Sequence, residues 1–236
     1  MNSSMFDGYA DHYDKWFMAN DKVFLSELKL LHHCLEPLKK DKILSVGCGS
    51  GLFESVLNKE YGINNIYGLE PSQDMAKIAV KRGIDVKPGN AETGELPSEE
   101  YDIIYFNGCS TYIPDLKKAY ENCYSALKKG GHFILLDVPK ESAYGILYSF
   151  AKHVGNYDKD IFDKIAPELP YPIELVTSGI FYTTLDKAKI IKEYLNMTNI
   201  KFYQTLTGSP VYTNDAVEEP ISGYDKGGYV AIVAQK

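Results

Sequence analysis

The feature that most constrains this chain is a glycine-rich turn at residues 43–54, where a short apolar run leads through three alternating glycines into a helical pattern. The glycines are Gly47, Gly49 and Gly51. Because they lack side chains, the backbone can turn sharply and a flat ligand can lie against it. Such a turn joins the carboxyl end of a strand to the amino end of a helix, where open α/β sheets bind small molecules. The sequence therefore predicts an α/β fold with a ligand site at this turn.

An acidic residue follows at a spacing typical of nucleoside sites. Glu70 closes a second apolar run, nineteen residues beyond Gly51. A carboxylate at the tip of the second strand is placed to accept hydrogen bonds from two ribose hydroxyls. A dinucleotide loop would need its third glycine at position 52, where this chain has Leu52. The pattern therefore favours a nucleoside-containing ligand and argues against a nicotinamide oxidoreductase.

Four further stretches follow the glycine turn in order. They are residues 68–72 with Met75, residues 89–92, residues 101–107 and residues 127–133. Together with the glycine turn, these stretches resemble the successive motifs of the class I S-adenosylmethionine-dependent methyltransferases. One such motif alone would be weak evidence, whereas five in order at the family's spacing are specific.

The resemblance implies a three-layer, Rossmann-like α/β fold, with a seven-stranded, mostly parallel sheet, helices on both faces and an antiparallel last strand. The alternation of strand and helix patterns from 43 to 138 itself indicates βαβ units. We expect strands near 43–46, 65–69, 84–87, 102–106, 132–138, 200–206 and 228–234. We expect helices near 5–18, 20–37, 51–59, 72–82, 115–128 and 185–196.

The chain is expected to form one domain over residues 1–236. Within it we expect two N-terminal lid helices in 1–40, the cofactor-binding core in 41–138, an inserted substrate cap in 140–180 and the rest of the sheet in 181–236. The cap is predicted from aromatic residues in a helical, proline-broken segment: Tyr144, Tyr148, Phe150, Tyr157, Phe162 and Tyr171.

The lid is implied by the resemblance, because relatives with a similar Tyr-Asp-x-Trp stretch, here at residues 13–16, fold this helix over the cofactor pocket. An amphipathic helix whose aromatic side chains pack on the core is the alternative.

Charge and cysteine content limit the partners. A net charge of −7 and a pI near 5.3 argue against a nucleic-acid partner, because phosphate binding needs basic patches. The four cysteines form no Cys-x-x-Cys pair, which favours reduced thiols in a cytoplasmic protein. The amino terminus does not resemble a signal peptide, and no apolar run approaches the ~20 residues of a membrane span. We therefore expect a monomer or homodimer with no metal site and no membrane partner.

The resemblance implies S-adenosylmethionine as cofactor and S-adenosylhomocysteine as product. The glycines would approach the cofactor through their backbone, and Glu70 would bind the ribose. Met75 would cover one adenine face or simply fill the core, and Asn90 would bind the adenine amine or simply form a polar turn. Asn107 would face the methionine portion or satisfy its own turn. The predicted cofactor contacts are Gly47, Cys48, Gly49, Gly51, Glu70, Pro71, Met75, Asn90, Ala91, Glu92, Asn107 and Tyr13.

Methyl transfer from a sulfonium requires mainly alignment, because the leaving group is already activated, and a base is needed only when the acceptor must lose a proton. Tyr112 is predicted to orient the acceptor or contact the sulfonium, with simple packing as the alternative. His12 and His153 are the predicted bases. Asp137, near the end of the fifth strand, either faces the acceptor or caps the next loop. Ser45 departs from the family pattern, which often has an acid there near the cofactor's ammonium.

The sequence predicts in-line methyl transfer from S-adenosylmethionine to a small, aromatic or hydrophobic acceptor. The resemblance extends to the branch that includes quinone and small-metabolite methyltransferases, which methylate O, N, C and S atoms. A catalytically silent S-adenosylmethionine-binding scaffold and an RNA or protein methyltransferase are the open alternatives.

Overall fold

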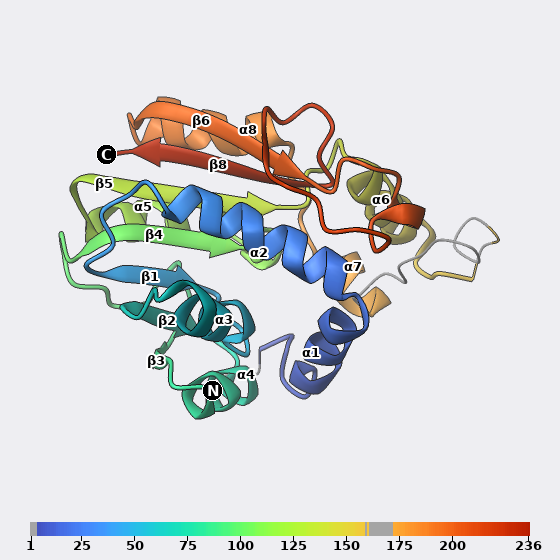
Figure 1. The fold of residues 1–236 in the computed structure, drawn as a ribbon, viewed down its shortest axis with the longest axis horizontal. Coiled ribbons are helices and arrows are strands. Elements are labelled where there is room, and N and C mark those ends of the chain that lie inside the picture. Colours follow the sequence, from blue (N-terminus) through green and yellow to red (C-terminus); the bar gives the residue numbers. More distant parts are fainter. Residues whose placement is uncertain (1–3, 159, 161–171) are drawn as a thin grey trace.

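The computed structural model describes residues 4–158, 160 and 172–236, so Phe162 and Tyr171 of the predicted cap lie outside the described residues. One eight-stranded sheet runs through the described part of the chain, in the order β3-β2-β1-β4-β5-β8-β6-β7 (Figure 1). Its strands are β1 (Ile43–Val46), β2 (Ile66–Glu70), β3 (Asp85–Pro88), β4 (Tyr101–Asn107), β5 (Leu127–Asp137), β6 (Thr198–Thr205), β7 (Ile221–Ser222) and β8 (Tyr229–Gln235).

The predicted mostly parallel sheet is confirmed. Strands β1 to β5 pair in parallel, whereas β8 runs antiparallel to both β5 and β6. The strand β7, which the sequence did not indicate, pairs antiparallel with β6 over only two residue positions. So short a pairing leaves no alternating pattern to read.

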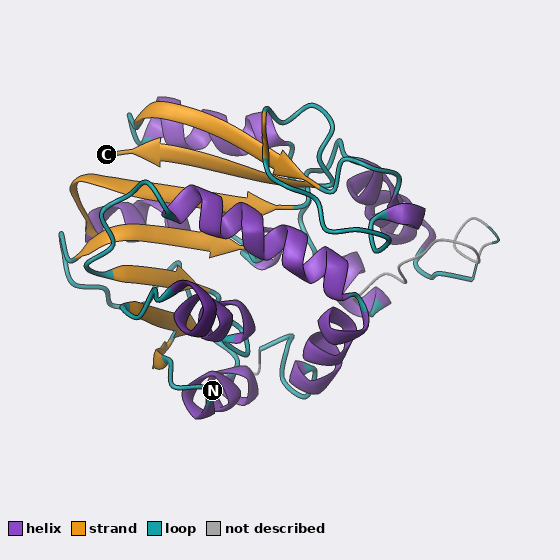
Figure 2. Ribbon diagram, in the orientation of Figure 1, coloured by secondary structure: helices purple, strands orange, loops and turns teal. Residues whose placement is uncertain are grey.

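The helices cover both faces of the sheet (Figure 2). They are α1 (Ala10–Ala19), α2 (Asp21–Leu35), α3 (Leu52–Tyr61), α4 (Gln73–Lys81), α5 (Leu116–Ala126), α6 (Ala143–Val154), α7 (Ile173–Ser178) and α8 (Thr184–Lys189). Shorter helical turns are η1 (Ser110–Tyr112), η2 (Ile190–Tyr194) and η3 (Pro210–Tyr212). Within the described residues, no helix combines the length and the apolar character that crossing a membrane requires.

The first helix begins later than predicted. Residues 5–9 form turns, and α1 starts only at Ala10. The cause is Gly8, whose φ of 79° lies in the left-handed region and interrupts the helix. The last predicted helix also changes character, because α8 continues into the π-helical turn η2.

Alternating side chains of the central strands build two separate cores. In β4, Ile103 and Tyr105 pack with α2 and α3, whereas Ile104 and Phe106 pack with α5 and the segment around Ile191. Successive side chains of a strand point to opposite faces, so a strand buried on both faces is apolar throughout. In Figure 1, α2 and α3 cover the near face of the sheet and α5 covers the far face.

The parallel strands end at one edge of the sheet. In Figure 1, the arrows of β4 and β5 point to the right, toward α1, α6 and α7. The long segment of residues 206–228, between β6 and β8, reaches the same edge. The fold therefore brings distant segments together where open α/β sheets bind their ligands.

Candidate functional site

A first cavity opens at the glycine turn, and we call it the turn cavity. Its walls come from the ends of β1, β2 and β4, from the loops after β3 and β4, and from residues 4–6. The predicted site residues that line it are Tyr13, Gly47, Gly49, Glu70, Pro71, Met75, Asn90, Ala91, Glu92, Asn107 and Tyr112. The predicted residues that do not line it are Cys48, Gly51, His12 and His153.

The three glycines of the turn have different surroundings. All three have φ values in the left-handed region, between 56° and 70°. A Cβ atom at Gly47 would lie 2.8 Å from the Cβ of Cys109, and one at Gly51 would lie 3.0 Å from the Cβ of Ala79. A Cβ at Gly49 would meet no atom within 4 Å. Gly47 and Gly51 therefore permit close packing, and Gly49 leaves its backbone open beside the cavity.

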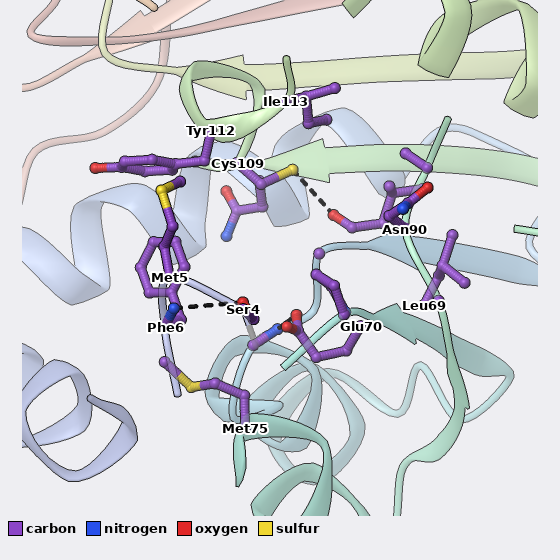
Figure 3. Close-up of a pocket in the computed structure, with 18 of the residues that line it drawn as sticks. Ser4, Met5, Phe6, Leu69, Glu70, Met75, Asn90, Cys109, Tyr112 and Ile113 are labelled. Carbon is purple, nitrogen blue, oxygen red and sulfur yellow. Dashed lines mark hydrogen bonds between the residues drawn. The ribbon is translucent and has the colours of Figure 1, made fainter. Parts of the chain in front are cut away.

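Glu70 is a buried carboxylate at the end of β2, with 5% of its surface exposed. It accepts backbone N–H hydrogen bonds from Gly49 at 2.9 Å and from Ser72 at 2.7 Å. Burial raises the pKa of this carboxyl to about 7, although both N–H donors favour the charged form. Each oxygen keeps a second acceptor site for a ligand hydroxyl. In Figure 3, Glu70 and Met75 lie across the cavity from Tyr112.

Cys48 belongs to the turn, but its side chain does not line the cavity. It is buried among Ala79, Ile84 and Val86 beneath the turn. Burial raises the pKa of its thiol well above the ordinary value, which keeps it protonated and unreactive. Any cofactor contact of Cys48 would therefore come from its backbone.

Ser45, the departure from the family pattern, is engaged inside the core. Its hydroxyl donates to Glu54 Oε1 at 2.7 Å, and the Tyr105 hydroxyl donates to the same oxygen at 2.7 Å. This buried acid is thus satisfied by two neutral donors.

The side chains of the predicted asparagines accept hydrogen bonds from other protein groups. The Asn90 side-chain oxygen accepts from the backbone N–H groups of Glu92 and Thr93, at 3.1 and 2.9 Å. Asn90 therefore shapes the turn after β3 while it lines the cavity. Asn107 accepts a hydrogen bond of 2.9 Å from the Tyr229 hydroxyl, which ties the end of β4 to β8.

The N-terminal segment adds a wall that the sequence did not indicate. Ser4, Met5 and Phe6 line the turn cavity, and the Phe6 ring packs edge-on against Tyr112 with centroids 4.9 Å apart. Figure 3 shows Met5 and Phe6 beside Tyr112. A short segment without helical periodicity carries no pattern that would have identified these contacts.

Polar contacts attach this segment and α1 to the core. Asp14 accepts hydrogen bonds from the Ser50 hydroxyl at 2.6 Å and from the Arg82 guanidinium at 2.7 Å. Asp7 accepts one of 2.7 Å from the hydroxyl of Ser72, the residue that caps α4. The acid of the Tyr-Asp-x-Trp stretch therefore joins α1 to the glycine turn.

A second cavity adjoins the first and shares Tyr13, Gly108 and Tyr112 with it. We call it the aromatic cavity, because α1, η1, α6, β8 and the segment before α8 contribute many of its rings. Those rings belong to Tyr13, Trp16, Phe17, Tyr112, Tyr144, Tyr148, Phe181 and Tyr229. Two carboxylates also line it, Glu27 from α2 and Asp137 from β5. The sequence did not single out Glu27, which lies within the apolar stripe of a helix.

Asp137, for which the sequence left two roles open, lies at the end of β5. It lines the aromatic cavity and accepts a hydrogen bond of 2.9 Å from the N–H of Val138. Its other oxygen lies 3.3 Å from the ammonium of Lys187, and both side chains of this ion pair are almost fully buried.

The two predicted bases lie apart from the cavities. His12 stacks on Tyr9 with ring centroids 5.6 Å apart, and His153 is exposed in the last turn of α6. Adjacent helix positions point about 100° apart, so His12 turns away where Tyr13 faces inward. No histidine is among the described residues that line either cavity, and the catalytic roles of His12 and His153 stay predictions. The described side chains also contain no group of three or more metal-ligating residues.

Comparisons with known proteins point to one enzyme class. Residues 44–135 match the family model described as a methyltransferase domain. The chain is 31% identical to an uncharacterized protein of Methanocaldococcus jannaschii over 99% of both chains. It is 32% identical to the uncharacterized methyltransferase YdaC of Bacillus subtilis, over 55% of this chain and 79% of that protein.

A solved structure is similar over nearly the whole chain. It is a Thermotoga maritima S-adenosylmethionine-dependent methyltransferase, described as a possible histamine N-methyltransferase. The TM-score is 0.80 at 28% identity, and the match covers 98% of this chain and 97% of that one. The likeness therefore includes the N-terminal and C-terminal segments that enclose the aromatic cavity.

Proposed function

Because this chain belongs to the class I S-adenosylmethionine-dependent methyltransferases, we propose that it methylates a small molecule bound in the aromatic cavity. The family's cofactor, S-adenosylmethionine, supplies a methyl group on a positively charged sulfur when it is bound. The observation that carries the proposal is that the two cavities adjoin at Tyr13, Gly108 and Tyr112, which line both. An acceptor in the aromatic cavity would then lie next to a cofactor in the turn cavity.

The turn cavity fits an adenosyl cofactor. The open backbone at Gly49 leaves room for a ligand, and Glu70 retains acceptor sites for ribose hydroxyls. Met75 and Asn90 line the same cavity, where the adenine contacts were predicted. In this proposal the chain contributes mainly orientation, which can lower a barrier by about 7–11 kcal/mol. Tyr112 would hold the acceptor in line, because it borders both cavities.

The enclosure of the aromatic cavity supports a small acceptor rather than RNA or protein. The helix α1, in the predicted lid, contributes Tyr13 and Trp16, and α6, in the described part of the predicted cap, contributes Tyr144 and Tyr148. The four free thiols and the net charge of −7 support a cytoplasmic enzyme without a nucleic-acid partner.

Turnover with a metabolite extract tests the proposal. We expect the protein to convert S-adenosylmethionine into S-adenosylhomocysteine only when the extract is present, with the methyl label in the low-molecular-weight fraction. The Glu70→Ala variant should lose this turnover at low cofactor concentration, and the exposed Glu60→Ala change in α3 is the matched control. Cofactor binding without turnover in any extract would favour the scaffold, and label in RNA or protein would favour a macromolecular acceptor.

A further inference from the structure

Glu27 is the buried acid of the aromatic cavity that lacks a partner. Only 8% of its surface is exposed, and within the described part of the chain its carboxylate makes no hydrogen bond and no ion pair. Glu54, which is also buried, accepts from Ser45 and Tyr105 instead. An isolated buried carboxylate is costly unless a donor satisfies it. Glu27 faces a cavity, so a ligand can supply that donor.

The charges around Glu27 do not balance. The aromatic cavity has two carboxylates, Glu27 and Asp137. The buried ammonium of Lys187 is paired with Asp137 at 3.3 Å, and no described cation is paired with Glu27. When both acids are ionised, one negative charge stays uncompensated. The cost appears as a pKa of about 8 for Glu27, raised by burial and then by the charge of Asp137.

Apart from Glu27 and Asp137, the titratable side chains among the described residues that line the aromatic cavity are tyrosines. The hydroxyl of Tyr144, from α6, hydrogen-bonds the Thr213 hydroxyl at 2.5 Å, and that of Tyr229, from β8, donates to Asn107. Tyr13 from α1, Tyr112 from η1 and Tyr148 from α6 complete the tyrosines that line this cavity. None of these groups carries a positive charge at neutral pH, so the tyrosines leave the charge of Glu27 uncompensated.

The rings of the aromatic cavity favour a cation as well. Aromatic faces attract an ammonium by about 0.5–2 kcal/mol, and the effect grows as the cation loses water. An anionic acceptor would meet repulsion from the ionised acids, and a neutral one would offer no positive charge to pair with Glu27 in its ionised form. Aromatic faces beside one unpaired carboxylate are complementary to a small organic ammonium.

Resting on the function proposed above, we propose that the acceptor is a small amine that enters as an ammonium ion and is bound by Glu27. An ammonium nitrogen has no lone pair, so one proton must leave before methylation, and Glu27 is the carboxylate placed to accept it. The nitrogen then bonds to the methyl carbon while the carbon–sulfur bond breaks, its electron pair remaining on sulfur. The products are an N-methylammonium ion and S-adenosylhomocysteine, and Glu27 returns its proton to water.

Matched acceptors test this proposal. The probes are phenethylamine with phenethyl alcohol and phenylacetate, and hexylamine with hexanol and hexanoate. Binding is measured by calorimetry in the presence of S-adenosylhomocysteine, and turnover by release of that product from S-adenosylmethionine. We expect at least one amine to be methylated and to bind about tenfold or more tightly than the matching alcohol. The matching carboxylate should not bind.

The variant Glu27→Gln keeps the shape of the side chain and removes its charge. We expect amine binding to weaken about tenfold or more, with alcohol binding and S-adenosylmethionine affinity unchanged. The rise of kcat/KM with pH that reflects ionisation of Glu27 should also disappear. Glu36→Gln, at the exposed end of the same helix, should behave as the wild type. If Glu27→Gln failed to fold, its cofactor affinity would fall as well, so the cofactor measurement distinguishes misfolding from a specific loss of amine binding.

The outcomes separate the two proposals. If neutral or anionic acceptors are methylated and amines are not, or if Glu27→Gln binds amines as well as the wild type does, the amine assignment is wrong and the small-molecule function stands. If no small molecule from the panel or from an extract is methylated, the small-molecule function falls, and the amine assignment falls with it.

Discussion

The two cavities are built in different ways. The turn cavity is formed largely by backbone and by short motifs at the ends of β1, β2 and β4, which the chain supplies in order. The aromatic cavity is formed by side chains from α1, α2, β5, α6 and β8, which are scattered from one end of the chain to the other. A site made by local turns is visible in a sequence motif, whereas a site made by distant side chains is not.

Their buried acids differ in the same way. Glu70 is held by two backbone N–H groups, one from the glycine turn and one from Ser72, and Glu27 has no hydrogen-bond partner among the described residues. The first acid is oriented before any ligand arrives. In our proposal the second gains a partner from what enters the cavity. We read this contrast as a preorganised contact on the cofactor side and a ligand-dependent one on the proposed acceptor side.

The largest expected effect is the change of the unfolding free energy with pH that the burial of Glu27 causes. Its folded-state pKa of about 8 lies above the ordinary pKa of 4.5 for a glutamate side chain, so the folded state holds this proton more tightly than the unfolded one. The resulting stability is fully present below pH 4.5 and is lost as the pH rises through 8. Relative to Glu27→Gln, the wild type should therefore lose about 2–4 kcal/mol of unfolding free energy between pH 5 and 9.

Urea unfolding at several pH values measures this difference. Glu36→Gln should follow the wild type at every pH. Parallel curves for the wild type and Glu27→Gln would mean that Glu27 is not an unsatisfied acid, and the contrast between the cavities would disappear.

The next effect tests the backbone character of the turn cavity. Gly47→Ala combines a left-handed φ with a Cβ placed 2.8 Å from the Cβ of Cys109, and should cost about 2–3 kcal/mol of unfolding free energy. Gly62→Ala is the matched control, because its φ of 69° is similar and its Cβ would meet nothing within 4 Å. Thermal unfolding should show the smaller loss for Gly62→Ala. Equal losses would show that crowding by Cys109 is unimportant.

Removal of the Glu70 carboxylate should affect ligand binding in the turn cavity but not in the aromatic cavity. Glu70→Ala should weaken S-adenosylmethionine binding by about 1–3 kcal/mol through loss of charged hydrogen bonds. Acceptor binding in the aromatic cavity should change little. Calorimetry measures both affinities, with Glu60→Ala as the control. Unchanged cofactor affinity would contradict the ribose role of Glu70.

The smallest effect is the pH dependence of cofactor binding. Because the pKa of Glu70 is about 7, the acid becomes protonated as the pH falls below 7 and loses acceptor strength. The affinity of the wild type should therefore fall by up to about tenfold from pH 8 to pH 6. Glu70→Gln should flatten this dependence in the same titration. A wild-type affinity that rises toward acid pH would contradict the assignment.

Much of the fold followed from local patterns. The alternation of strands and helices over the first five strands depends on residues close together in the chain, and the structure confirms it. The break before α1 depends on one residue, Gly8, whose left-handed backbone no hydrophobic pattern reveals. The edge strand β7 is too short to leave any pattern. Local errors of this kind arise where a single conformation outweighs the average propensity.

The site residues also differ in how far local sequence patterns predicted them. Gly47, Gly49 and Glu70 were expected in one cavity and lie there, because consecutive strand ends of a parallel sheet must meet at one edge. His12 was chosen for its chemistry, and the direction of one helical side chain places it elsewhere. Glu27 was overlooked, because an acid within an apolar stripe has no signature until its neighbours are known.

The amino-acid sequence alone therefore determined the class of fold, the enzyme family and the cofactor, since these rest on backbone conformations encoded within a few residues. Only the tertiary structure decided which side chains surround the aromatic cavity. Their meeting depends on how the N-terminal helices, α6 and the C-terminal strand β8 pack at one edge of the sheet, and long-range packing leaves no short-range pattern.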